Sequence, residues 1–186
     1  MKTTDAEITF ITGNPHKAEQ LSKYLDIPVL HKKVDLTEVQ SLDLSEIITN
    51  KVKEAYQNTG TPVIVDDVSL MINSMGRLPG PFIKFFLSEL STAGICNLVS
   101  NLKDVSAKAE ICIGYYDGKH LEICVGIVEG MIAKKPKGTN GFGFDAIFIP
   151  KGYTQTRAEM SETDYDNTSP RKLALDKLKV YLDTLK

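Results

Sequence analysis

One short segment without a polar face constrains the fold more than any other part of this sequence. Residues 62–65, Pro-Val-Ile-Val, form a continuously apolar run that leads directly into two acidic residues, Asp66 and Asp67. Continuous apolar runs of this kind are typical of strands that are buried on both faces of a sheet. The segment therefore predicts a central strand that ends at the acidic pair.

The elements around this strand alternate between strand and helix patterns. Strands are predicted at residues 8–11 and 28–34, and a helical pattern follows each of them; the second helix is expected over 45–56 with Ser45 as its N-cap. Further along the chain we expect helices at 82–90 and 93–102, strands at 108–116, 121–128 and 144–149, and a helix at 168–185 with Ser169 as N-cap and Pro170 as its first residue. This order predicts an α/β protein with a mixed sheet, in a single domain over residues 1–186.

Composition limits the partners and the compartment. The net charge of −2 argues against a nucleic-acid backbone or an anionic membrane as the main partner. The cysteines, Cys96, Cys112 and Cys124, lack CxxC spacing, which favours reduced thiols in a cytoplasmic protein. No apolar run approaches the roughly 20 residues that span a bilayer, so we expect a soluble protein. Only three of the 22 basic residues are arginines, and a rare arginine is a better candidate for planar recognition than one lysine among many.

The loop Thr12-Gly13-Asn14-Pro15-His16-Lys17 joins a predicted strand to a predicted helix. Free backbone N–H groups at a helix start, together with a lysine in the first turn, suit a phosphate. A capped helix start without a ligand explains the same residues.

The acidic pair and a glycine-rich segment are the other candidates. Adjacent carboxylates such as Asp66 and Asp67 repel each other unless a cation or proton intervenes, and hard oxygen ligands suit Mg²⁺. In Gly141-Phe142-Gly143-Phe144-Asp145, a flat base could stack on Phe142, and Asp145 could accept a hydrogen bond from a ring N–H. The alternatives are an acidic turn and a glycine-rich strand entry with core aromatics.

In chain order, these segments resemble the inosine triphosphate pyrophosphatase family. The set that carries the resemblance comprises Thr12-Gly13-Asn14 with Lys17, Asp35-Leu36 with Glu38 and Gln40, Val65-Asp66-Asp67, Leu78-Pro79-Gly80-Pro81 with Lys84, Phe142-Gly143-Phe144-Asp145, and Ser169 with Arg171. It runs from about Ile8 to the final helix.

The resemblance implies hydrolysis of deaminated purine nucleoside triphosphates (ITP, dITP and XTP) to the monophosphate and pyrophosphate. It implies Mg²⁺ as the cofactor, with Mn²⁺ as an alternative metal, and a homodimer. The implied fold is a long, twisted mixed sheet flanked by helices, with two lobes and a central nucleotide cleft.

The resemblance also assigns roles to the matched positions. The residues implied to bind the phosphates are Thr12, Gly13, Asn14, Lys17, Lys51 and Lys84. The residues implied to bind the metal are Glu38, Asp66 and Asp67, and Asp67 is also implied to be the catalytic general base. The residues implied to bind the nucleoside are Phe142, Gly143, Phe144, Asp145, Ser169 and Arg171. Arginine can only donate hydrogen bonds, so Arg171 would favour a base with an oxygen acceptor over one with an amino group.

The departures from the family pattern concentrate on nucleotide recognition. Pro170 stands where the family usually has histidine, Tyr165 where it has lysine, and Val68 where it has serine or threonine; Ala146 replaces a common proline. We therefore expect retained hydrolysis with altered affinity or base preference. Two alternatives stay open: the same chemistry on another modified purine or pyrimidine nucleotide, and a nucleotide-binding protein without turnover.

Overall fold

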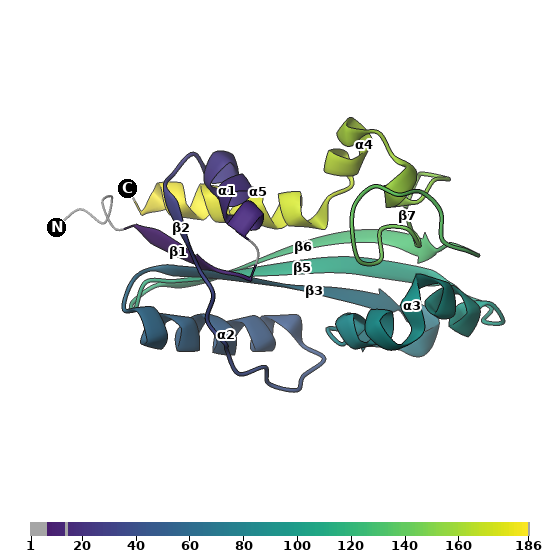
Figure 1. Cartoon of the computed structure of the whole chain (residues 1–186), viewed down its shortest axis with the longest axis horizontal. Helices are drawn as coiled ribbons and strands as arrows, with labels where there is room; N and C mark the ends of the chain where they lie inside the picture. The colour runs from purple at the N-terminus through teal and green to yellow at the C-terminus, as the bar shows by residue number, and fades with distance from the viewer. Residues whose placement is uncertain (1–6, 14, 186) are drawn as a thin grey trace. The chain divides into compact units, whose positions relative to one another are not determined.

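The computed structural model describes residues 7–13 and 15–185, and the chain folds into two compact units. Unit 1 comprises Met1–Asp67, Cys112–Gly126 and Leu173–Lys186, and unit 2 comprises Val68–Ile111 and Ile127–Lys172. Among the described residues, seven strands form a sheet in the order β2-β1-β3-β5-β6-β7, with β4 paired to β3 (Figure 1). Parallel and antiparallel pairs both occur, which confirms the predicted mixed sheet.

Unit 1 places helices on both faces of its strands. Strand β1 (Ile8–Ile11) pairs in parallel with β2 (Val29–Lys32) and with β3 (Val63–Ile72). Helices α1 (Pro15–Leu25) and α5 (Pro170–Thr184) lie on one face, and α2 (Leu44–Thr59) covers the other (Figure 1). The start of β3 is fully buried for this reason, as its apolar sequence predicts.

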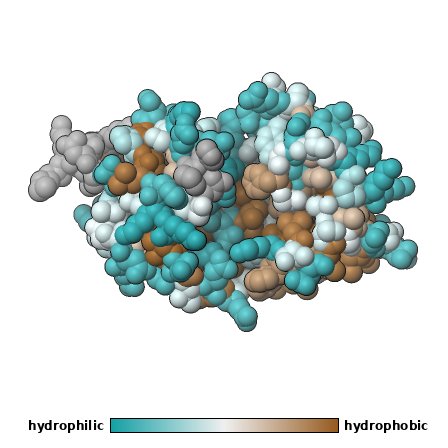
Figure 2. Space-filling view, viewed as in Figure 1, coloured by the Kyte–Doolittle hydropathy of each residue, from teal (hydrophilic) through white to brown (hydrophobic). Residues whose placement is uncertain are grey.

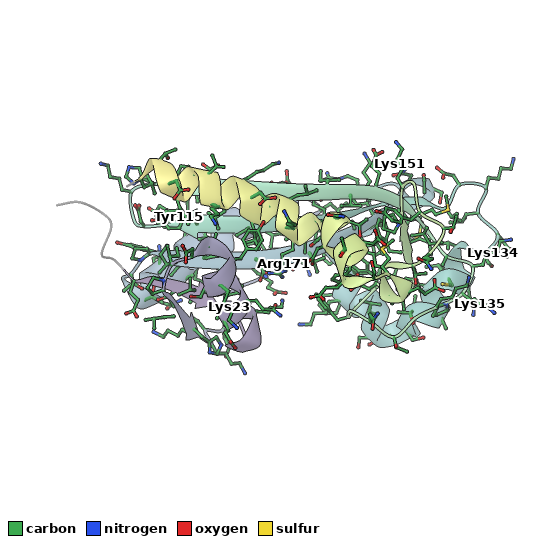
Figure 3. The ribbon with its side chains drawn as sticks, turned by 90° about the horizontal axis from the view of Figure 1, so that it is seen from above. Lys23, Tyr115, Lys134, Lys135, Lys151 and Arg171 are labelled. Carbon is green, nitrogen blue, oxygen red and sulfur yellow. The ribbon has the colours of Figure 1, made fainter. Side chains whose placement is uncertain are left out.

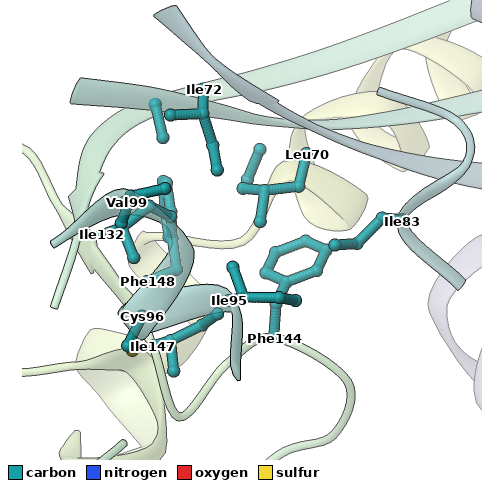
Figure 4. Close-up of a cluster of buried hydrophobic side chains, with 12 residues drawn as sticks. Leu70, Ile72, Ile83, Ile95, Cys96, Val99, Ile132, Phe144, Ile147 and Phe148 are labelled. Carbon is teal, nitrogen blue, oxygen red and sulfur yellow. The ribbon is translucent and has the colours of Figure 1, made fainter. Parts of the chain in front are cut away.

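Unit 2 packs around the second half of β3. Its elements are β4 (Pro79–Gly80), α3 (Ile83–Val99), most of β5 (Ser106–Tyr116), the end of β6 (Leu121–Ile132), β7 (Phe148–Pro150) and α4 (Glu162–Asn167). Figure 4 shows the core of this unit, in which Leu70 and Ile72 of β3 contact side chains of α3 and of the segment before β7. Hydrophobic residues also gather on parts of the molecular surface (Figure 2). Phe85 and Leu98 of α3 are exposed.

Several boundary predictions are wrong: the strand expected at 121–128 extends to Ile132, and three further errors have a clear physical cause. Strand β3 does not end at Asp66 and Asp67 but runs on to Ile72, because the apolar residues beyond the pair are buried in the core of unit 2. The N-cap of α2 is Asp43 and not Ser45, since the Asp43 carboxylate accepts hydrogen bonds from the N–H groups of Ser45 and Glu46.

The third error concerns the predicted strand at residues 144–149. Residues 144–147 form a turn, in which the Phe148 N–H donates to the Phe144 carbonyl, and β7 begins only at Phe148. Helix α4 was not predicted, although Ser161 caps it by accepting from the Asp164 N–H. Predictions for α3 and α5 are confirmed: α3 is broken at Ser91 (φ 59°) into two helical segments, and Pro170 opens α5 with the Ser169 hydroxyl accepting from the Lys172 N–H.

The Asp43 cap yields a stability prediction. Asp43→Ala removes the acceptor for two backbone N–H groups at the start of α2 and should lower the free energy of unfolding by about 1 kcal/mol. Ser45→Ala, at the position wrongly expected to cap the helix, is the matched control and should change stability by less. Chemical denaturation of both variants measures the difference; equal losses would contradict the assignment of the cap.

Candidate functional site

A lysine of α2 brings two of the predicted acidic residues together in unit 1. The Lys51 Nζ donates to Glu38 Oε1 at 2.8 Å and to Asp67 Oδ2 at 2.7 Å. Lys51 is only 8% exposed because the inner face of α2 packs on the sheet, and β3 brings Asp67 to its ammonium. Two carboxylates that share one ammonium lie within about two hydrogen-bond lengths of each other.

The two carboxylates beside Lys51 determine the protonation state of its ammonium. Burial alone lowers the pKa of Lys51, but the charge of Asp67 and the hydrogen bonds to Asp67 and Glu38 outweigh it and raise the pKa above its ordinary value of 10.5. Lys51 therefore stays cationic at neutral pH. Its ammonium has three N–H donors, and the two carboxylates use two of them.

The same cluster is the candidate metal site of unit 1. The described residues contain no group of three or more His, Cys, Asp or Glu side chains arranged to hold a metal ion. Mg²⁺, however, is commonly bound by only one or two protein carboxylates together with substrate phosphates and water. The paired carboxylates of Glu38 and Asp67 fit that mode, and the residues present do not form an all-protein cage.

The loop before α1 lies next to the acidic strand. Lys17, in the first turn of α1, has its Nζ 3.9 Å from Asp66 Oδ2, so this predicted phosphate residue and this predicted metal residue are brought together. The Thr12 N–H donates to the Lys32 carbonyl, which fixes the end of β1. A Cβ on Gly13 would meet no described atom within 4 Å outside its chain neighbours. Asn14 lies outside the described residues.

In unit 2, the predicted base-reading carboxylate is the centre of a buried network. Asp145 is 6% exposed; its Oδ1 accepts from Arg157 Nε at 2.9 Å, and its Oδ2 accepts from the Phe142 N–H at 2.9 Å and from the Tyr165 hydroxyl at 2.8 Å. A carboxylate has about four acceptor sites, so one site on Oδ1 remains. The network shapes the preceding loop, because a Cβ on Gly141 (φ +75°) would lie 2.3 Å from Asp145 Oδ2.

Arg157 organises this network and was not predicted to belong to the site. Its Nε donates to Asp145. Its Nη1 donates to the Tyr165 carbonyl at 3.0 Å, to the Thr168 hydroxyl at 2.8 Å and to the Thr168 carbonyl. It thus joins the loop of Asp145 to the segment that leads into Ser169 and α5. Its rarity was the available signal, since Arg157 is one of only three arginines.

Tyr165, which replaces the family lysine, packs against the same arginine. The Arg157 Cζ lies 3.9 Å from the centroid of the Tyr165 ring, a cation–π contact. Burial, the nearby charge of Asp145 and the hydrogen bond to it raise the pKa of Tyr165, so the hydroxyl stays protonated and donates to Asp145. The position therefore lacks a cation of its own but has one directly over its ring.

The other predicted residues of unit 2 differ in their exposure. Phe142 is 66% exposed, as a stacking residue requires, whereas Phe144 is buried in the hydrophobic core. Arg171 lies in the first turn of α5 (Figure 3), directly after Pro170. Lys84 is exposed in the first turn of α3. Val68 packs against the core of unit 2, so this departure from the family pattern serves packing.

Comparisons with known proteins identify the family of this chain. The sequence pattern of the Ham1 family matches residues 8–181. The inosine triphosphate pyrophosphatase of Schizosaccharomyces pombe is 34% identical over 96% of each chain, and the dITP/XTP pyrophosphatase of Saccharolobus solfataricus is 34% identical over 96% of this chain and 94% of its own. The structure of a HAM1 protein from Coxiella burnetii matches with a TM-score of 0.86 and 26% identity, covering 96% of this chain and 99% of that one. The matches extend over nearly the whole chain and confirm the family resemblance: this chain belongs to the Ham1 family.

Proposed function

We propose that this protein hydrolyses deaminated purine nucleoside triphosphates (ITP, dITP and XTP) to the nucleoside monophosphate and pyrophosphate. The names of its relatives in Schizosaccharomyces pombe and Saccharolobus solfataricus support the substrate class. The observation that carries the proposal is the ion cluster of Lys51, Glu38 and Asp67, because it combines a cation for phosphate with carboxylates for a metal and for water.

The phosphate side of the reaction is assigned to unit 1. Lys17 supplies a charge in the first turn of α1, and Gly13, which has no side chain, permits close backbone approach to an anion. The third N–H of Lys51 adds a donor beside the carboxylates. Thr12 and Asn14 complete the proposed set in unit 1, and Lys84 of unit 2 is proposed as a further phosphate residue. Hydrolysis of a phosphoanhydride depends mainly on such positioning and charge neutralisation.

The proposed cofactor is Mg²⁺, with Mn²⁺ as an alternative. Glu38 and Asp67 would hold it, with Asp66 close by, and when bound it supplies charge neutralisation for the phosphates. Asp67 is the proposed general base: its carboxylate orients and deprotonates the attacking water. The hydrogen bond from Lys51 to Asp67 Oδ2 fixes the orientation of that carboxylate.

The nucleoside side is assigned to unit 2. Phe142 is the proposed stacking platform, Asp145 the acceptor for a ring N–H, and Arg171 the donor to an exocyclic oxygen; Gly143, Phe144 and Ser169 shape the surroundings. Adenine lacks the ring proton and the exocyclic oxygen, so both polar groups disfavour it. The Asp145 site left on Oδ1 is the one available to a base.

The proposed molecule is a cytoplasmic homodimer that acts on free nucleotides and on neither nucleic acid nor a membrane. Exposed hydrophobic residues of α3, Phe85 and Leu98, support the dimer. The three cysteines are buried free thiols, which supports a reducing compartment. Among the described residues no helix is long and apolar enough to cross a membrane.

The reaction type is tested by identifying the products. Purified protein with Mg²⁺ should release pyrophosphate and a monophosphate from inosine and xanthosine triphosphates, and should act much less on adenosine triphosphate. A panel that also includes guanosine and pyrimidine triphosphates separates this proposal from a preference for another nucleotide. Orthophosphate as the main product, or binding without any turnover across the panel, would overturn the proposal.

The phosphate loop generates a second prediction, with a control on the same helix. Lys17→Ala should weaken triphosphate binding by about 1.5–3 kcal/mol, the usual scale for a hydrogen bond to a charged group. Lys23, two turns along α1, pairs with Glu19 on the exposed surface, and Lys23→Ala should have little effect. Equal losses in the two variants, measured as Kd by titration calorimetry, would show a general charge effect and no specific loop.

A further inference from the structure

The guanidinium of Arg157 is almost completely buried, yet one of its nitrogens is unused. Arg157 is 4% exposed, and its Nε and Nη1 make all of its hydrogen bonds. Nη2 therefore has no hydrogen-bond partner among residues 7–13 and 15–185. No polar side-chain atom of those residues is both fully buried and unpartnered, so Nη2 must reach the surface of the unit. This Nη2 donor can therefore form a hydrogen bond with an acceptor atom of a ligand.

The open donor stands next to an open acceptor. The covalent geometry of a guanidinium places Nη2 beside Nε, and Nε is bonded to Asp145 Oδ1 at 2.9 Å. Oδ1 is also the oxygen that keeps a vacant acceptor site, because the Tyr165 hydroxyl and the Phe142 N–H both use Oδ2. The pair of Asp145 and Arg157 thus offers one acceptor and one donor side by side.

A ring edge with a matching pair of groups completes this arrangement. In a 6-oxopurine such as hypoxanthine, the ring N1–H donates and the adjacent O6 accepts, which is the complement of Oδ1 and Nη2. Adenine presents an acceptor at N1 and an amino donor at C6, so it mismatches both positions. The exposed ring of Phe142 is the next feature along, since its own N–H is bonded to Asp145.

We infer that Arg157 is a second specificity-determining arginine of this chain: its Nη2 donates to the 6-oxo group of the purine, while Asp145 Oδ1 accepts from its N1–H. The carbonyl oxygen has two lone pairs, so it can accept from Arg157 as well as from the proposed donor Arg171. The inference rests on the proposed function and extends it to a residue without an assigned role. It also accounts for Tyr165. The cation absent from position 165 is supplied by Arg157, whose Cζ lies 3.9 Å from the Tyr165 ring centroid.

The pair defines the substrate class as 6-oxopurines. Guanine has the same N1–H and O6 groups as hypoxanthine, so these two contacts do not distinguish it from hypoxanthine. Guanosine triphosphate should accordingly be accepted better than adenosine triphosphate.

The inference is tested by removing the cation at position 157 and placing a lysine at position 165, where the family usually has one. Arg157→Gln should lower the ratio of kcat/KM for inosine over adenosine triphosphate by about tenfold to a hundredfold, the scale of one charge-assisted hydrogen bond. The loss should appear mainly in the KM for inosine triphosphate. The double variant Arg157→Gln/Tyr165→Lys should regain a large part of the ratio, because a lysine at 165 can place its ammonium where the guanidinium lay.

Two controls separate recognition from folding. Arg77→Gln removes an exposed arginine of the same unit and should leave the ratio unchanged. If Arg157→Gln does not fold, Arg157→Lys replaces it: the ammonium can still pair with Asp145 but cannot reproduce the three directions of the guanidinium, so the ratio should fall in a folded protein. Thermal melting identifies which variants are folded.

The outcomes are distinct. A folded Arg157 variant that slows both triphosphates equally, or a double variant that recovers nothing, would overturn the inference and leave the proposed function intact. A wild-type protein that forms no monophosphate and pyrophosphate would overturn the proposed function. Calorimetric binding of inosine and adenosine monophosphates, which needs no turnover, would then still decide the role of Arg157 by the same ratio.

Discussion

The ammonium of Lys51 is the interaction on which the proposed reaction centre depends. Its two hydrogen bonds hold Glu38, from the segment before α2, and Asp67, from β3, at one point of unit 1. Without that cation the two carboxylates would repel each other, and ionised groups near the sheet would be costly. The lysine therefore holds the two carboxylates close together before any ligand arrives. The family relationship and the paired acids together support the proposal that this cluster is the reaction centre.

In unit 2, the buried carboxylate of Asp145 is paired with the guanidinium of Arg157. The Asp145 carboxylate is buried, and Arg157 pairs with it through a single nitrogen while its other nitrogens serve the chain and the surface. A buried ion pair contributes little net stability against a hydrophobic replacement, so its presence is better explained by the specific geometry that it imposes. The altered positions of this chain fit that view, because Tyr165 joins the pair through its ring and its hydroxyl.

The sequence predicted the helices and strands better than their ends and their side-chain networks. The buried strand, the broken helix α3 and the start of α5 follow from local patterns, namely an apolar run, two helical stretches and a Ser-Pro pair. The end of β3 did not, because Asp66 and Asp67 interrupt the apolar run while the residues beyond them are buried by long-range packing. The acidic residues and lysines were proposed from their ordered motifs, whereas the contact of Arg157 with Asp145 joins residues 12 apart through a turn that no local pattern specifies.

The measurement that tests the account most directly is turnover by Asp67→Asn at saturating Mg²⁺. The substitution keeps the size and one acceptor oxygen of the side chain but removes the charge and the base. The account predicts a fall in kcat of about a hundredfold or more, the range attributed to general base catalysis, while the free energy of unfolding changes far less. Turnover close to that of the wild type, in a folded variant, would contradict the assignment of Asp67 and with it the reaction centre proposed around Lys51.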